Sequence, residues 1–231
     1  MNAPAANYTP PLGYAILTPF YDLAIALMTR EAVWRNLLIK ELAPQAGERI
    51  LDVGSGTGSL AVAVQRRAPE CRYIGVDPDA DAVRMASRKA VRAKVSADFH
   101  IGFLSAAEIP TDQQPDKIVS SLVLHQVPLA EKGRILEQAH TCLNPGGGLF
   151  IADYGEQSSV LMRALFRLMV QSVDGKEDTQ PNADGVLISL MLDAGFVDVV
   201  EVTRLPTPTG SISIYSANKA ASDKDRAHGS R

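Results

Sequence analysis

The chain has 231 residues, of which 46% are hydrophobic and 21% charged, a composition typical of a soluble globular protein. Lysine and arginine number 23 against 26 acidic residues, so the net charge is −3. This balance argues against nucleic acid or an anionic membrane as a partner, because both select basic surfaces. Cys71 and Cys142 form no CxxC pair and have no histidine at ligand spacing, which argues against a metal site or disulfide framework and fits a reducing cytoplasm.

The N-terminal part shows no pattern of an export signal or a membrane span. The first cation is Arg30, so the basic region of an export signal is absent. The apolar stretch 13–28 is interrupted by Pro19 and Asp22 and is too short to cross a bilayer. We therefore expect a cytoplasmic protein.

The two ends differ in composition from the rest of the chain. Residues 1–12 lack an apolar period and predict a flexible arm, and the polar residues 220–231 predict a disordered tail. No repeat or linker divides residues 13–219, so we expect a single domain, with substrate-side elements in 13–45 and 154–185.

Short β-branched runs alternate with helical patterns through the first two thirds of the chain. Strands are predicted over 49–53, 73–77, 98–101, 117–122 and 148–152, and helices over 59–67, 80–93 and 130–142. This alternation predicts an α/β fold with a mainly parallel sheet covered on both faces.

The C-terminal third has a different pattern. A helix is predicted over 158–173, a polar loop over 174–182, a helix over 186–194, and strands over 196–202 and 211–217. Strands joined without a long helix favour antiparallel pairing, which gives a mixed edge to a seven-stranded sheet. The helix over 158–173 has a wide apolar face that predicts either ordinary core or the roof of a pocket for an apolar acceptor.

A glycine-rich segment, LDVGSGTGSL, follows the first predicted strand. Gly54, Gly56 and Gly58 alternate and a helix begins directly behind them. Glycine lets the backbone approach a ligand, and the helix N-terminus offers unpaired N–H groups. The alternative is a tight turn without a ligand. Because the loop follows a buried strand that carries an acid, we favour a ligand loop.

The glycine spacing differs between families of nucleotide-binding loops. A dinucleotide loop has the form GxGxxG/A, and Ser59 stands at its last position, which fits poorly. The spacing GxGxG after LDV instead resembles the first motif of class I S-adenosylmethionine-dependent methyltransferases. Asp77 ends the next strand, where the resemblance implies an acid for the ribose hydroxyls. Its alternative role is to stabilise the N-terminus of the following helix.

Two further segments resemble later motifs of the same family. PDKIVSSLVLHQ resembles its fourth-strand segment, and LNPGGGLFIAD resembles the segment leading into its fifth strand. Tyr21-Asp22 and the helix that follows resemble the UbiE-like (methyltransferase type 11) branch involved in ubiquinone biosynthesis. The family resemblance implies a Rossmann-like doubly wound fold.

The resemblance also implies a set of cofactor-binding residues. An acid that reads adenine in many members is replaced here by Ser105, whose hydroxyl brings no charge. The implied cofactor-binding residues are Asp52, Gly54, Ser55, Gly56, Gly58, Asp77, Pro78, Ser105, Ala106 and Ser121.

His125 follows the fourth strand and is the candidate for a catalytic base or an acceptor contact. Its alternative role is that of a hydrogen-bonded structural histidine. Tyr21, Asp153 and Tyr154 are further candidates for the acceptor site, although Asp153 also fits a helix cap.

These features predict an S-adenosylmethionine-dependent methyltransferase that acts on a small apolar or aromatic acceptor at oxygen, nitrogen or carbon. The alternatives are another reaction on the same cofactor, such as a cyclisation or rearrangement, and a binding protein without chemistry. No metal is expected, and a homodimer is compatible with the sequence.

Overall fold

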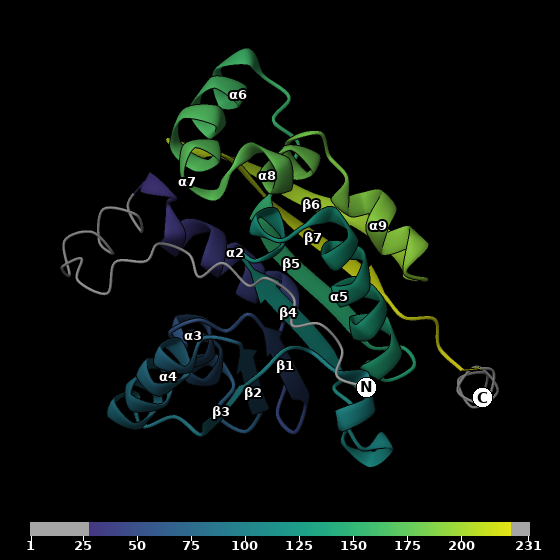
Figure 1. Cartoon of the computed structure of the whole chain (residues 1–231). Coiled ribbons are helices and arrows are strands. Elements are labelled where there is room, and N and C mark those ends of the chain that lie inside the picture. The colour runs from purple at the N-terminus through teal and green to yellow at the C-terminus, as the bar shows by residue number, and fades with distance from the viewer. Residues whose placement is uncertain (1–27, 223–231) are drawn as a thin grey trace, which may run out of the picture.

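The computed structural model describes residues 28–222, so Tyr21, the expected arm at 1–12 and most of the expected tail lie outside the described residues. Figure 1 shows a central twisted sheet with helices packed on both of its faces. Its strands are β1 (Arg49–Val53), β2 (Arg72–Asp77), β3 (Ala97–Ile101), β4 (Lys117–Ser121), β5 (Gly148–Tyr154), β6 (Val197–Thr207) and β7 (Gly210–Asn218).

The strand order is β3-β2-β1-β4-β5-β7-β6. β1 to β5 pair in parallel, and β7 runs antiparallel to both β5 and β6. This confirms the expected Rossmann-like, mainly parallel seven-stranded sheet with an antiparallel C-terminal strand. β1 lies between β2 and β4, so the chain reverses direction across the sheet there. Ligands of such sheets bind beyond the carboxyl ends of the strands at this reversal.

Each face of the sheet has its own apolar core, because neighbouring residues of a strand point to opposite faces. On β1, Ile50 packs with α2 (Glu31–Leu42) and α3 (Ser59–Arg67), whereas Leu51 packs with α5 (Leu129–Cys142) and α9 (Leu187–Asp193). α4 (Ala80–Ala93) packs beside α3 and β3. Among residues 28–222, no helix is both long enough and apolar enough to cross a bilayer.

The segment between β5 and β6 differs from the prediction. The expected helix over 158–173 is divided into α6 (Val160–Phe166), a π-helical turn (Arg167–Gln171) and α7 (Ser172–Asp174). Only Phe166 and Val170 of its apolar face are buried in the core. Figure 1 shows α6 and α7 gathered with α8 beyond one end of the sheet.

The polar loop predicted over 174–182 is wrong, because this stretch forms α8 (Lys176–Ala183). Two of its three buried side chains are polar and bond to backbone: Asn182 donates to the Tyr154 carbonyl at 2.9 Å, and Thr179 donates to the Gly175 carbonyl at 2.5 Å. A helix held in this way lacks the apolar period that sequence patterns detect.

Candidate functional site

The glycine loop lies at the carboxyl end of β1, and its three glycines have φ values of +73° (Gly54), +51° (Gly56) and +72° (Gly58). These left-handed conformations disfavour residues with a side chain. A Cβ at Gly54 would collide with Val123, and one at Gly58 would lie 2.8 Å from the Ala86 side chain. At Gly56 no atom lies within 4 Å of that position. Gly56 is therefore the loop glycine with open space beside it.

Asp77 fixes this loop from the end of β2. Its Oδ2 accepts the Gly56 N–H at 2.8 Å, and its Oδ1 accepts the Asp79 N–H at 2.9 Å. Each carboxylate oxygen has a second lone pair, so Asp77 keeps capacity for ligand hydroxyls. Lys89 of α4, which the sequence analysis missed, donates to the hydroxyls of Thr57 (2.8 Å) and Ser59 (2.7 Å). The sequence feature that could have indicated this contact is the pair of hydroxyl residues, Thr57 and Ser59, on either side of Gly58.

Two buried polar atoms beside the loop have no partner within the described residues. They are Oδ1 of Asp52 and Oγ of Ser55. The other oxygen of Asp52 accepts the hydroxyl of Tyr73 at 2.8 Å. Burial, more than the neighbouring charge of Asp77, raises the pKa of Asp52 to about 7, although the Tyr73 bond opposes the shift. A buried acceptor and a buried hydroxyl without partners fit the polar end of a ligand that carries a positive charge.

In the segment expected to hold an adenine ring, one of the two expected hydrogen-bonding groups is already used by the protein. Ser105 is half-buried, and its side chain does not cap the short 3-10 turn (Ala106–Glu108) that follows it. The N–H of Ala106 donates to Gln138 of α5 at 2.9 Å, so this group already has a protein acceptor. Pro78 directly follows β2, and Ser121 ends β4; both are half-buried.

His125 lies in a short 3-10 turn (Leu124–Gln126) that begins three residues after the end of β4, and it is buried. Its Nδ1 lies 2.7 Å from Oδ1 of Asp153, and its Nε2 lies 3.5 Å from Oδ2 of Asp174 on α7. Burial alone would lower the pKa of His125, but the charges and hydrogen bonds of Asp153 and Asp174 raise it to about 9. The imidazole is therefore a cation at neutral pH, held between two carboxylates.

Asp153 and Tyr154 end β5 and are also buried. Oδ2 of Asp153 accepts the N–H groups of Val123 (3.1 Å) and Leu124 (2.7 Å), so this carboxylate caps the turn that carries His125. The cap of α6 is instead Ser159. Tyr154 packs edge-on against the His125 ring at 5.0 Å, and its hydroxyl bonds to Thr209 at 2.8 Å.

The structure thus brings the predicted residues together at one edge of the sheet. Ser55 and Gly56 lie in the glycine loop between Asp52 and Asp77, and His125, Asp153 and Tyr154 form a buried group at the carboxyl ends of β4 and β5. The sequence analysis missed two members of this second group, Asp174 and Lys132. Asp174 was placed in a polar loop, and Lys132 lies in a helix where a lysine is expected to face solvent.

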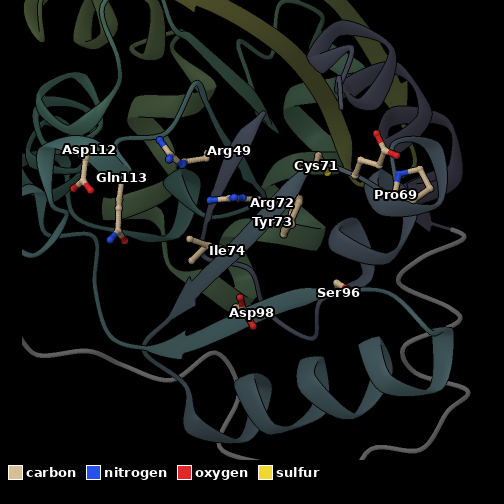
Figure 2. A pocket seen from close by; sticks show the side chains of 11 residues that line it. Arg49, Pro69, Cys71, Arg72, Tyr73, Ile74, Ser96, Asp98, Asp112 and Gln113 are labelled. Atoms are coloured by element: carbon tan, nitrogen blue, oxygen red, sulfur yellow. The ribbon is translucent and has the colours of Figure 1, made fainter. Parts of the chain in front are cut away.

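An open hollow of about 680 Å³ lies at the amino ends of the strands, opposite the glycine loop, as Figure 2 shows. Its lining includes Arg49 and Arg72, the first residues of the neighbouring strands β1 and β2. Asp98 and Asp112 also line it, so its charge is mixed. Because the glycine loop follows the other end of β1, this hollow is separate from the candidate site.

Comparison with known proteins agrees with this geometry. Residues 50–147 match the family model described as "Methyltransferase domain". The chain is 28% identical over 163 residues to a demethylmenaquinone methyltransferase of Deinococcus radiodurans, covering 69% of this chain and 66% of that one. It is 26% identical over 157 residues to the ubiquinone/menaquinone biosynthesis C-methyltransferase UbiE of Syntrophotalea carbinolica, covering 65% and 63%.

The matched stretch thus spans just under two thirds of the length of these relatives. Among solved structures, an O-methyltransferase family protein of Burkholderia thailandensis superimposes with a TM-score of 0.65 at 15% identity, covering 87% of this chain and 59% of that one. This likeness concerns the fold. Together, the motifs, the fold and the curated relatives show that the chain carries a methyltransferase domain over residues 50–147 and is similar to class I S-adenosylmethionine-dependent methyltransferases of the UbiE-like branch.

Proposed function

We propose that this protein transfers the methyl group of S-adenosylmethionine to a small apolar or aromatic acceptor. The proposal is carried by the arrangement of residues at the carboxyl ends of β1 and β2. There the open Gly56 is pinned by Asp77, and Asp52 and Ser55 offer buried polar atoms without protein partners. The two curated relatives are named for methylation of quinone precursors or for quinone biosynthesis, which supports an aromatic acceptor.

The residues of this edge fit the parts of the cofactor. Asp77 would hold the ribose hydroxyls, since its carboxylate has lone pairs beyond those used by Gly56 and Asp79. Asp52 and Ser55 would hold the charged amino-acid end, and Ser105 with Pro78 and Ser121 would border the adenine side. When bound, S-adenosylmethionine supplies an activated methyl group on a sulfonium, so no further activation of the leaving group is needed.

The task left to the protein is to exclude water and to hold the acceptor in line with the methyl group, an effect that can reach roughly 7–11 kcal/mol. We place the acceptor beside the turn after β4, near His125, Asp153 and Tyr154, with Tyr21 as a further contact. His125 is cationic and engaged at both nitrogens, so the geometry favours a positioning role for it over that of a free base.

A direct test incubates the purified protein with methyl-labelled S-adenosylmethionine and a panel of phenols, amines, thiols and quinols. The proposal expects label transfer to at least one aromatic or apolar member, and loss of that transfer in Asp77→Ala. Cofactor binding without label transfer to any acceptor class would favour a different reaction or a binding protein instead.

A further inference from the structure

Lys132 is a fully buried lysine in the first turn of α5. Its ammonium donates to three backbone carbonyls at short range: Leu124 (2.5 Å), Val127 (2.6 Å) and Asp178 (2.8 Å). An ammonium has three N–H donors, so these contacts use all of them. Leu124 lies in the turn after β4, Val127 directly follows that turn, and Asp178 belongs to α8. One side chain therefore joins the sheet edge to the helices that follow β5.

His125 makes a second connection between the same two parts. Its Nδ1 is bonded to Asp153 of the sheet at 2.7 Å, and its Nε2 lies 3.5 Å from Asp174, the last residue of α7. Asp174 and Asp178 stand four positions apart, on either side of Gly175. Both connections thus join the turn after β4 to the same short stretch, residues 174–178.

Stability alone does not explain a charge at the position of Lys132. Burying an ammonium is costly, and an apolar side chain of similar volume often stabilises a protein at least as well. The N-terminal turn of a helix also disfavours a cation, because the helix dipole is positive there. Burial lowers the pKa of Lys132 to about 8, against the opposing charges of Asp153 and Asp178. What the ammonium provides is a set of hydrogen bonds that joins the chain after β4 to α8.

We propose that Lys132 and His125 form a latch that holds α7 and α8 against the turn after β4, and that this latch positions the methyl acceptor. The second half of this inference rests on the proposed function. Lys132 is a positioning residue, since it acts through the turn and α8 and its own ammonium is enclosed. The glycine loop and Asp77 belong to β1 and β2, so loosening the latch should weaken acceptor binding while leaving cofactor affinity unchanged.

The test compares Lys132→Met, which keeps the length of the side chain without its charge, with Lys219→Met. Lys219 also donates to backbone carbonyls, but at the other end of α5: that of Thr141 in its last turn (3.2 Å) and that of Leu143, the residue after the helix (2.8 Å). Hydrogen exchange followed by mass spectrometry should show at least tenfold faster exchange in 167–183 for Lys132→Met and not for Lys219→Met. The S-adenosylmethionine Kd should stay within twofold of wild type.

A second variant keeps the test informative if Lys132→Met does not fold. Asp174→Asn removes the charge that faces Nε2 of His125 at a half-buried position with little change in size, and it should also speed exchange in 167–183. With an acceptor in hand, both latch variants should raise its KM at least fivefold and change kcat less. A merely structural role would instead lower the amount of active protein, and hence the apparent kcat, at constant KM.

The outcomes separate the latch from the proposed function. Unchanged exchange in 167–183 in the folded variants would overturn the latch. Faster exchange with an unchanged acceptor KM would overturn its role in positioning the acceptor. Failure of the wild-type protein to bind S-adenosylmethionine would contradict the proposed function, whereas the exchange comparison would still decide the latch.

Discussion

Replacement of Asp77 by alanine should weaken both the glycine loop and cofactor binding. The change removes the acceptor of the Gly56 N–H at 2.8 Å and of the Asp79 N–H at 2.9 Å. Hydrogen bonds to a charged group contribute about 1.5–3 kcal/mol each, so the free energy of unfolding should fall by about 2–4 kcal/mol after partial rehydration of the freed N–H groups. Loss of the proposed ribose contacts should cost a further 1.5–3 kcal/mol of binding, or roughly 10- to 150-fold in Kd.

Asp79→Ala is the matched control for this change. Asp79 lies two residues away and caps α4 by accepting the N–H groups of Asp81 (2.8 Å) and Ala82 (3.3 Å). Its loss should reduce the stability by about 1 kcal/mol, as for other helix caps, without changing the Kd. Isothermal titration with S-adenosylmethionine and urea unfolding of both variants measure these effects. A Kd for Asp77→Ala within twofold of wild type would refute the ribose assignment.

Three further predictions concern the loop and the titrating groups. Gly56→Val should abolish cofactor binding in titration calorimetry while the protein stays folded, whereas Gly54→Ala should lower the melting temperature more, because its Cβ collides with Val123. The folded-state pKa of His125 is raised to about 9, so its stabilising contribution is complete below pH 6.5 and is lost as the pH rises towards 9. The difference in unfolding free energy between wild type and His125→Gln should therefore shrink by about 3 kcal/mol at most over that window, and a constant difference would contradict the ion-pair assignment. Ionisation of Asp52 near pH 7 should strengthen binding of the cationic cofactor between pH 6 and 8, and titrations of Asp52→Asn should show no such rise; equal slopes would exclude Asp52 as a contact.

The first two thirds of the fold could be predicted from sequence because hydrophobic periodicity indicates each helix and strand, and glycines mark where several of them end. The predicted helices 59–67 and 80–93 match α3 and α4 residue for residue. The glycine loop and Asp77 mark the carboxyl ends of β1 and β2, so the motifs predict a cofactor site there. The cofactor-binding and acceptor-contact roles assigned to individual residues remain predictions.

The segment between β5 and β6 could not be predicted in the same way. Most of the buried contacts of α8 are made by polar groups, such as Asn182 bonded to the Tyr154 carbonyl, and its one buried apolar residue, Ala183, sets no apolar period. Lys132 is hidden for the same reason, because only tertiary structure shows that three carbonyls converge on its ammonium. The pairing of His125 with Asp174 joins residues 49 positions apart that no motif connects.

Hydrogen exchange of the wild-type protein with and without S-adenosylmethionine tests the central claim most directly, because it reports which edge of the sheet holds the cofactor. We expect slower exchange in residues 54–59 and 77–82, around the glycine loop and Asp77. We expect no change in 69–72 and 112–113, which line the hollow at the amino ends of the strands. Protection confined to that hollow, with the glycine loop unchanged, would contradict the account.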